Sequence, residues 1–149
     1  MKFITAVAGG FAGACALTFI HETLRQVDKD APRMDLLGME AIAKTLVAAD
    51  KPTPQLNALY GWTMAADIIS NGIYYSFAGA AKKDKTFMSG ALLGAAAGIG
   101  AVVLPGPLGL VEETSNRTNK TRLLTIGLYL AGGIIAAKIM NRLEQTEED

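Results

Sequence analysis

Charge and cysteine are both scarce in this chain. Charged residues make up only 19% of the 149 residues, whereas a soluble domain usually carries about 25%. Lysine plus arginine and aspartate plus glutamate number 14 each, so the formal net charge is zero. We therefore expect no nucleic-acid partner, because such proteins present a basic surface. The single cysteine, Cys15, excludes an internal disulfide and a metal site built from several cysteines.

Short motifs of known enzyme chemistry are missing as well. The sequence has neither a GxxxxGK(S/T) phosphate loop nor a GxSxG nucleophile elbow. Its one histidine, His21, has no spacing that matches a zinc motif. We expect no cofactor and no bound metal, and the sequence favours a role other than catalysis.

Long apolar segments are what the sequence has instead. Hydrophobic residues make up 50% of the chain, and the mean hydropathy is +0.27. A helix needs about 20 apolar residues to cross a hydrocarbon core of about 30 Å. We predict four spans, at residues 3–20, 56–81, 86–104 and 123–140. The expected fold is a single all-α domain over residues 1–149, an integral membrane bundle of four transmembrane helices whose surroundings are the lipid bilayer.

A further helix is predicted outside the membrane, over residues 32–49. Pro32 suits the first turn of a helix. Five apolar side chains fall on one face at helical spacing, namely Leu36, Met39, Ile42, Ala43 and Leu46. Arg33, Glu40 and Lys44 fall on the other face. We interpret this segment as an amphipathic surface helix that covers the bundle or rests on the membrane interface.

Asp67 is the most informative residue, because it lies in the middle of the second predicted span. A carboxylate at that depth costs about 2.5–3.5 kcal/mol to insert. It belongs to a row of polar side chains at spacings of three or four, and therefore on one helix face: Tyr60, Thr63, Asp67, Asn71 and Tyr74. The row is either a polar path or ligand pocket, in which Asp67 binds a cation or exchanges a proton, or a set of hydrogen bonds between helices.

Glycines at every fourth position predict tight helix packing. Gly90, Gly94 and Gly98 lie in the third predicted span, and Gly9 and Gly13 in the first. Such spacing lets two backbones approach closely. The pattern fits packing within one bundle and packing between subunits equally, and we expect a homo-oligomer or a larger membrane complex.

A second candidate site lies at the membrane face where the first span ends. His21 and Glu22 close that span, and Glu112 and Glu113 follow a Pro-Gly-Pro turn at the same face. Histidine with carboxylates is able to hold a metal or to work as acid and base. The alternative is a set of interfacial hydrogen bonds.

Three function classes follow from these patterns. The sequence favours a small, non-catalytic membrane protein that assembles with itself or serves as an accessory subunit of a membrane complex. The first alternative is a channel or transporter for a cation, a proton or a small solute, lined by the row around Asp67. The second is a membrane enzyme with a site near His21 and Glu22. The lysine-rich turn at 82–85 favours cytoplasmic termini, and a bacterial inner membrane is the expected location.

Overall fold

The computed structural model describes residues 2–146, and this part of the chain is helical without strands. In chain order the α-helices are α1 (Phe3–Val27), α2 (Met34–Ala48), α3 (Leu56–Ser76), α4 (Thr86–Val103), α5 (Glu113–Asn116) and α6 (Asn119–Thr146). Two short 3-10 helices, η1 (Phe77–Ala80) and η2 (Lys83–Lys85), lie between α3 and α4. The prediction of an all-α fold is confirmed.

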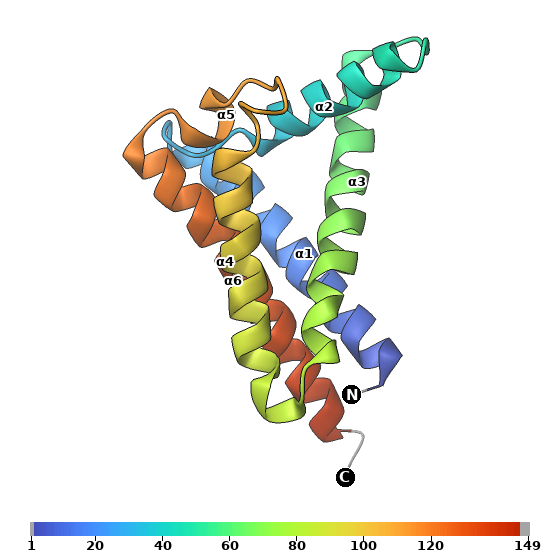
Figure 1. Ribbon diagram of the computed structural model, residues 1–149, viewed down its shortest axis with the longest axis vertical. Coiled ribbons are helices and arrows are strands. Elements are labelled where there is room, and N and C mark those ends of the chain that lie inside the picture. The colour runs from blue at the N-terminus through green and yellow to red at the C-terminus, as the bar shows by residue number, and fades with distance from the viewer. Residues whose placement is uncertain (1, 147–149) are drawn as a thin grey trace.

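The four long helices run alternately up and down the longest axis of the molecule (Figure 1). Helix α1 runs from the N-terminus to the end that carries α2 and α5, and α3 returns to the starting end. Helix α4 then repeats the first direction and α6 the second. We call the end that holds residues 28–55 and 104–118 the loop end. The opposite end, with residue 2, residues 77–85 and the last turns of α6, is the terminal end.

Three of these helices are long and apolar enough to cross a membrane. They are Phe3–Val27, Lys83–Val103 and Asn119–Thr146, the second of which joins η2 to α4. Helix α3 has 21 residues but does not reach the same hydropathy. Hydropathy and length therefore support three of the four predicted spans.

Two of the helices extend beyond the predicted spans. Helix α1 continues to Val27, seven residues beyond the predicted end, and α6 runs from Asn119 to Thr146 rather than over 123–140. The added residues, about two turns of helix, include Glu22 and Arg25, whose side chains form an ion pair with each other. The predicted span was ended where charged residues begin. The helix continues past that point, because charged side chains that pair with each other do not end a helix.

Helix α2 lies close to the predicted bounds. Met39 of its predicted apolar face is buried, but Leu36 of that face is 42% exposed. Asp35 and Leu37, which the predicted face left out, are buried. Asp35 turns inward because a guanidinium group pairs with it, as described below.

Helix α6 packs between α1 and α4, and the predicted glycine repeats lie on these contacts. Gly9 and Gly13 of α1 and Gly90, Gly94 and Gly98 of α4 all face α6. A Cβ atom added at Gly94 would lie 2.6 Å from the carbonyl oxygen of Tyr129, so only glycine permits this approach. Both repeats are therefore used for packing within the chain's own bundle.

The buried core lies where α1, α3 and α6 meet. Its members are Ala14, Leu17, Tyr75, Ala78, Leu128, Ala136 and Met140. Tyr75 is the largest fully buried side chain, and its hydroxyl donates a hydrogen bond to the Tyr129 carbonyl at 2.9 Å. Because the hydroxyl has an acceptor, the ring can be buried without an unsatisfied donor.

Candidate functional site

The polar row on α3 makes contacts with three other helices. Tyr60 donates to Glu22 of α1 at 2.8 Å, and Tyr74 donates to the Leu93 carbonyl of α4 at 3.1 Å. Thr63 is buried against Gly38 of α2. These three members of the row therefore contact neighbouring helices.

Asp67 accepts hydrogen bonds on both of its carboxylate oxygens. The Thr18 hydroxyl of α1 donates to Oδ2 at 3.1 Å, and the Asn71 amide donates to Oδ1 at 2.9 Å. One partner is on the facing helix and the other is one turn along α3. Together they orient the carboxylate toward α1 and replace two of the hydrogen bonds that water would supply.

A small cavity adjoins Asp67 on its loop-end side. It has a volume of about 10 Å³ and is lined by Leu17, Thr18, His21, Met34, Asp67, Leu128 and Tyr129. This volume is close to the smallest that holds one water molecule. The cavity brings Asp67 and His21 to one space, although the two residues belong to the two separate sites that the sequence suggested.

His21 is buried with an oxygen atom beside each ring nitrogen. Nε2 lies 2.9 Å from the Pro32 carbonyl oxygen, and Nδ1 lies 3.3 Å from Oε1 of Glu22. A carbonyl accepts and does not donate, so Nε2 carries a proton. Glu22 also receives a hydrogen bond from Arg25 at 2.5 Å. His21 thereby ties the end of α1 to the segment that enters α2.

Arg33 and Asp35 extend this cluster, and the sequence did not single them out together. The Arg33 guanidinium donates to both carboxylate oxygens of Asp35, at 2.9 and 2.7 Å, and Arg25 lies 3.9 Å away. Burial alone would raise the pKa of Asp35. The hydrogen bonds from Arg33 and the two positive charges outweigh burial, so the pKa lies below its ordinary value. The Arg-x-Asp spacing directly after a proline was the available signal.

Glu112 and Glu113 do not join His21. Both are exposed, and Oε2 of Glu112 lies 3.5 Å from the side-chain amide of Asn116. Within the described residues, no group of three or more His, Cys, Asp or Glu side chains is arranged to hold a metal ion. The structure thus brings together two of the four residues of the predicted interfacial site, His21 and Glu22.

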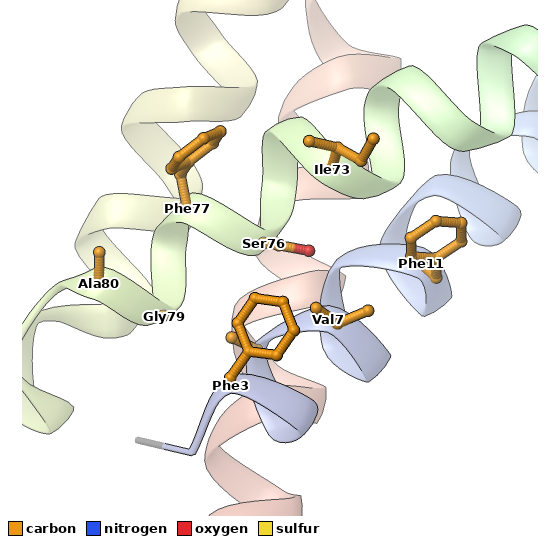
Figure 2. Close-up of a pocket in the computed structure, with 9 residues that line it drawn as sticks. Phe3, Val7, Phe11, Ile73, Ser76, Phe77, Gly79 and Ala80 are labelled. Atoms are coloured by element: carbon orange, nitrogen blue, oxygen red, sulfur yellow. The ribbon is translucent and has the colours of Figure 1, made fainter.

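An apolar groove lies at the terminal end, between α1 and the last turns of α3. Its volume is about 620 Å³. Figure 2 shows Phe3, Val7 and Phe11 on one wall and Ile73 and Phe77 on the other. The Ser76 hydroxyl, its main polar group, already donates to the Gly72 carbonyl. The groove offers apolar contact only, of the kind that a lipid chain fills.

The chain was also compared with known proteins. No protein-family model matches it, and no curated protein or solved structure is significantly similar to it.

Most polar groups of the candidate site are already bonded to other groups of the chain. Asp67, Tyr60 and Tyr74 hold bonds inside the chain, and the charges of Glu22, Arg25, Arg33 and Asp35 pair with one another. These groups fasten α1, α2 and α3 together. Among the described residues, polar side chains line two further open places: the α3/α4 cleft, with Ser70, Asn71 and Tyr74, and the last turns of α6, with Lys138, Asn141 and Arg142.

Proposed function

We propose that this chain is a four-span integral membrane protein with a non-catalytic role, assembling with itself or with other subunits through its lipid-facing surface. The number of spans follows from connectivity. Helices α1 and α4 both run from the terminal end to the loop end (Figure 1). If both cross the bilayer, the segment between them must return across it, and α3 is the helix that does so.

The hydrogen bonds of Asp67 lower the free-energy cost of placing α3 in the bilayer. A buried carboxylate is costly in hydrocarbon, but this one accepts from Thr18 and Asn71 and faces α1. Polar side chains lower the hydropathy of α3 while they lie against protein. Low hydropathy is therefore compatible with a span whose polar row faces protein while apolar side chains such as Leu56, Ile69 and Ile73 are exposed.

The outward surface is the part of the bundle that remains for a partner. Large apolar side chains of α4 are exposed, among them Phe87, Met88, Leu92, Ile99 and Val103. Gly90, Gly94 and Gly98 of α4 are covered by α6. A partner helix would consequently meet α4 through large side chains. This use of the polar and glycine faces inside the chain is the observation that carries the proposal.

The orientation and the location of the protein are proposed from the positions of its lysines. Lys2, Lys82, Lys83 and Lys85 all belong to the terminal end, and short lysine-rich loops stay on the cytoplasmic side. Both termini would then be cytoplasmic, and a bacterial inner membrane is the proposed location.

Native mass spectrometry of the protein, extracted gently from its own membrane, tests the proposed assembly. We expect a defined homo-oligomer or a stoichiometric second subunit. Leu92→Ala combined with Ile99→Ala should weaken that assembly, because both side chains project from α4. The control is Phe19→Ala on α1, which is also exposed. A monomer that is bare under all extraction conditions would contradict the proposal.

Proton or cation transport is a second candidate, favoured by the cavity that Asp67 shares with His21. In liposomes that contain a pH-sensitive dye, transport predicts proton flux above that of protein-free liposomes. Asp67→Asn should abolish this flux. Flux at the protein-free level, or flux unchanged by Asp67→Asn, would remove the transport candidate.

A further inference from the structure

The last turns of α6 carry a polar hollow on the surface of the terminal end. Its volume is about 480 Å³, and it is lined by Lys138, Asn141, Arg142 and Gln145. These positions are spaced by three or four residues, so they lie on one face of the helix. All four residues are exposed or partly exposed. The hollow is therefore open to the surroundings of the bundle.

The two cations of this hollow have no acidic partner in the part of the chain that the structure describes. Neither Lys138 nor Arg142 forms an ion pair there, and Glu144 of the same helix is not part of the lining. At the loop end, by contrast, arginines and lysines pair with carboxylates. The hollow beside η2 also contains a carboxylate, because Asp84 lines it together with Lys85. The α6 hollow thus presents positive charge without a counter-charge in its lining.

The chemistry of the lining matches a phosphate group. A guanidinium and an ammonium group carry several N–H donors each, and the amides of Asn141 and Gln145 add more. Phosphate oxygens accept such bonds from several donors at once, and their charge strengthens each bond. Lys138 and Arg142 are one turn apart, about 6 Å along the helix axis. Both side chains can therefore reach one phosphate.

The position of the hollow along α6 indicates where that phosphate comes from. Helix α6 is apolar enough to cross a membrane, and Lys138 is an exposed residue within its last turns. A lysine near the end of a span lays its stem along the apolar chains and extends its amine to the headgroups. Anionic headgroups are enriched in the cytoplasmic leaflet, on the side proposed for the terminal end.

We infer that the hollow formed by Lys138, Asn141, Arg142 and Gln145 binds the phosphate of an anionic phospholipid from the surrounding leaflet. The two cations pair with the phosphate, and the amides donate to its remaining oxygens. A zwitterionic lipid binds less well, because its own ammonium group offsets the phosphate charge. This inference rests on the proposed membrane location of α6, but it requires neither the crossing of α3 nor assembly of the chain.

Native mass spectrometry of the full chain in neutral detergent micelles tests this site. The micelles are titrated with phosphatidylglycerol or with phosphatidylcholine of the same acyl chains, and the dissociation constant of the first bound lipid is measured. Phosphatidylglycerol should bind at least about fivefold more tightly, the effect of one cation beside an anionic headgroup. The full chain retains residues 147–149, so any competition from these acidic residues is included in the measured affinity.

Two double variants separate a site from general surface charge. Lys138→Gln combined with Arg142→Gln should reduce the affinity for phosphatidylglycerol to that for phosphatidylcholine. The matched control is Lys82→Gln combined with Lys85→Gln, which removes two charges from exposed positions of the same end and leaves the hollow intact. The control should retain the preference for phosphatidylglycerol. Because all four positions are exposed, both variants should elute from a sizing column as the unmodified protein does.

Calorimetric titration with inorganic phosphate distinguishes a lipid headgroup from free phosphate. Inorganic phosphate should not bind at concentrations at which the lipid saturates the site, because it lacks the acyl chains that keep the headgroup at the membrane surface. Binding of inorganic phosphate as tight as that of the lipid would overturn the assignment to lipid.

Equal affinity of the unmodified chain for the two lipids, or equal losses in the two double variants, would overturn the inference. Failure of the proposed membrane location has a different signature. The chain would then be released from its native membrane by alkaline washing, a result that does not depend on any added lipid.

Discussion

Helices α6 and α3 are fixed in the bundle by opposite means. Along α6, what we call the glycine seam brings backbones of α1 and α4 against it at Gly13, Gly90 and Gly94. Along the loop-end half of α3, what we call the polar seam joins it to α1 through the bonds from Thr18 to Asp67 and from Tyr60 to Glu22. The first seam depends on shape, and the second on matched donors and acceptors.

This difference explains why α6 is apolar enough to qualify as a membrane span and α3 is not. Glycine packing leaves the remaining positions of α6 free to be apolar, so α6 qualifies as a span. A polar seam needs polar residues, and each of them lowers the hydropathy of α3. A polar membrane helix is thus expected wherever hydrogen bonds rather than small residues hold it.

Breaking the glycine seam should have the largest effect. A Leu side chain in Gly94→Leu would begin 2.6 Å from the Tyr129 carbonyl oxygen, so the helices must separate. We expect a loss of about 3 kcal/mol in the free energy of unfolding, measured by denaturant titration in micelles. The matched control is Gly127→Leu on α6, where no atom lies within 4 Å. Equal losses in the two variants would contradict the packing of α4 on α6.

Removing the buried carboxylate of α2 should have an intermediate effect. Asp35→Asn loses a pair with Arg33 and is expected to cost about 1.5–3 kcal/mol near neutral pH, as for hydrogen bonds to charged groups. Thermal unfolding of the variant and of the unmodified protein measures this difference.

The same pair gives a pH dependence with a definite sign. The folded-state pKa of Asp35 lies below its ordinary value, so the stabilisation is complete above the unfolded pKa of about 3.9. It is lost as pH falls through the lower, folded-state pKa. The stability gap between the unmodified protein and Asp35→Asn should therefore shrink in acid. A gap that stays constant down to about pH 3 would count against the pair.

The bond between Thr18 and Asp67 should have the smallest effect. A double-mutant cycle with Thr18→Val and Asp67→Leu should give a coupling free energy of about 0.6 kcal/mol, and not above about 1.7 kcal/mol. Leu has no acceptor, so each single variant removes the hydrogen bond, as the cycle requires. A coupling indistinguishable from zero would show that this hydrogen bond does not hold α3 to α1.

The sequence predicted those parts of the fold that depend on local pattern. The apolar runs located α1, α4 and α6, and the lysine-rich turn before Thr86 located the reversal between α3 and α4. The glycine spacing identified faces that pack closely, although it did not say against which helix. That choice depends on contacts between α6 and glycines that lie from 28 positions away (Gly98 and Ile126) to 131 positions away (Gly9 and Met140), which no local pattern contains.

The sequence predicted which residues of α3 belong to the candidate site, but not which residues of other helices they contact. The spacing of Tyr60, Asp67 and Asn71 identified polar groups on one side of α3, but their partners Glu22 and Thr18 lie on α1. Asp35 was missed because its burial depends on pairing with Arg33, a contact that apolar periodicity does not contain. Long-range pairing decided both cases.

The crossing of α3 is the central claim, and the sidedness of its two ends tests it most directly. Cys15 is exposed, so it is first replaced by serine, and single cysteines are then introduced by Lys51→Cys before α3 and Lys82→Cys after it, both at exposed positions. A membrane-impermeant thiol reagent is added to sealed vesicles made from the native membrane. The four-span account predicts that one of these cysteines reacts in intact vesicles and the other only after lysis. Reaction of both from the same side would contradict it.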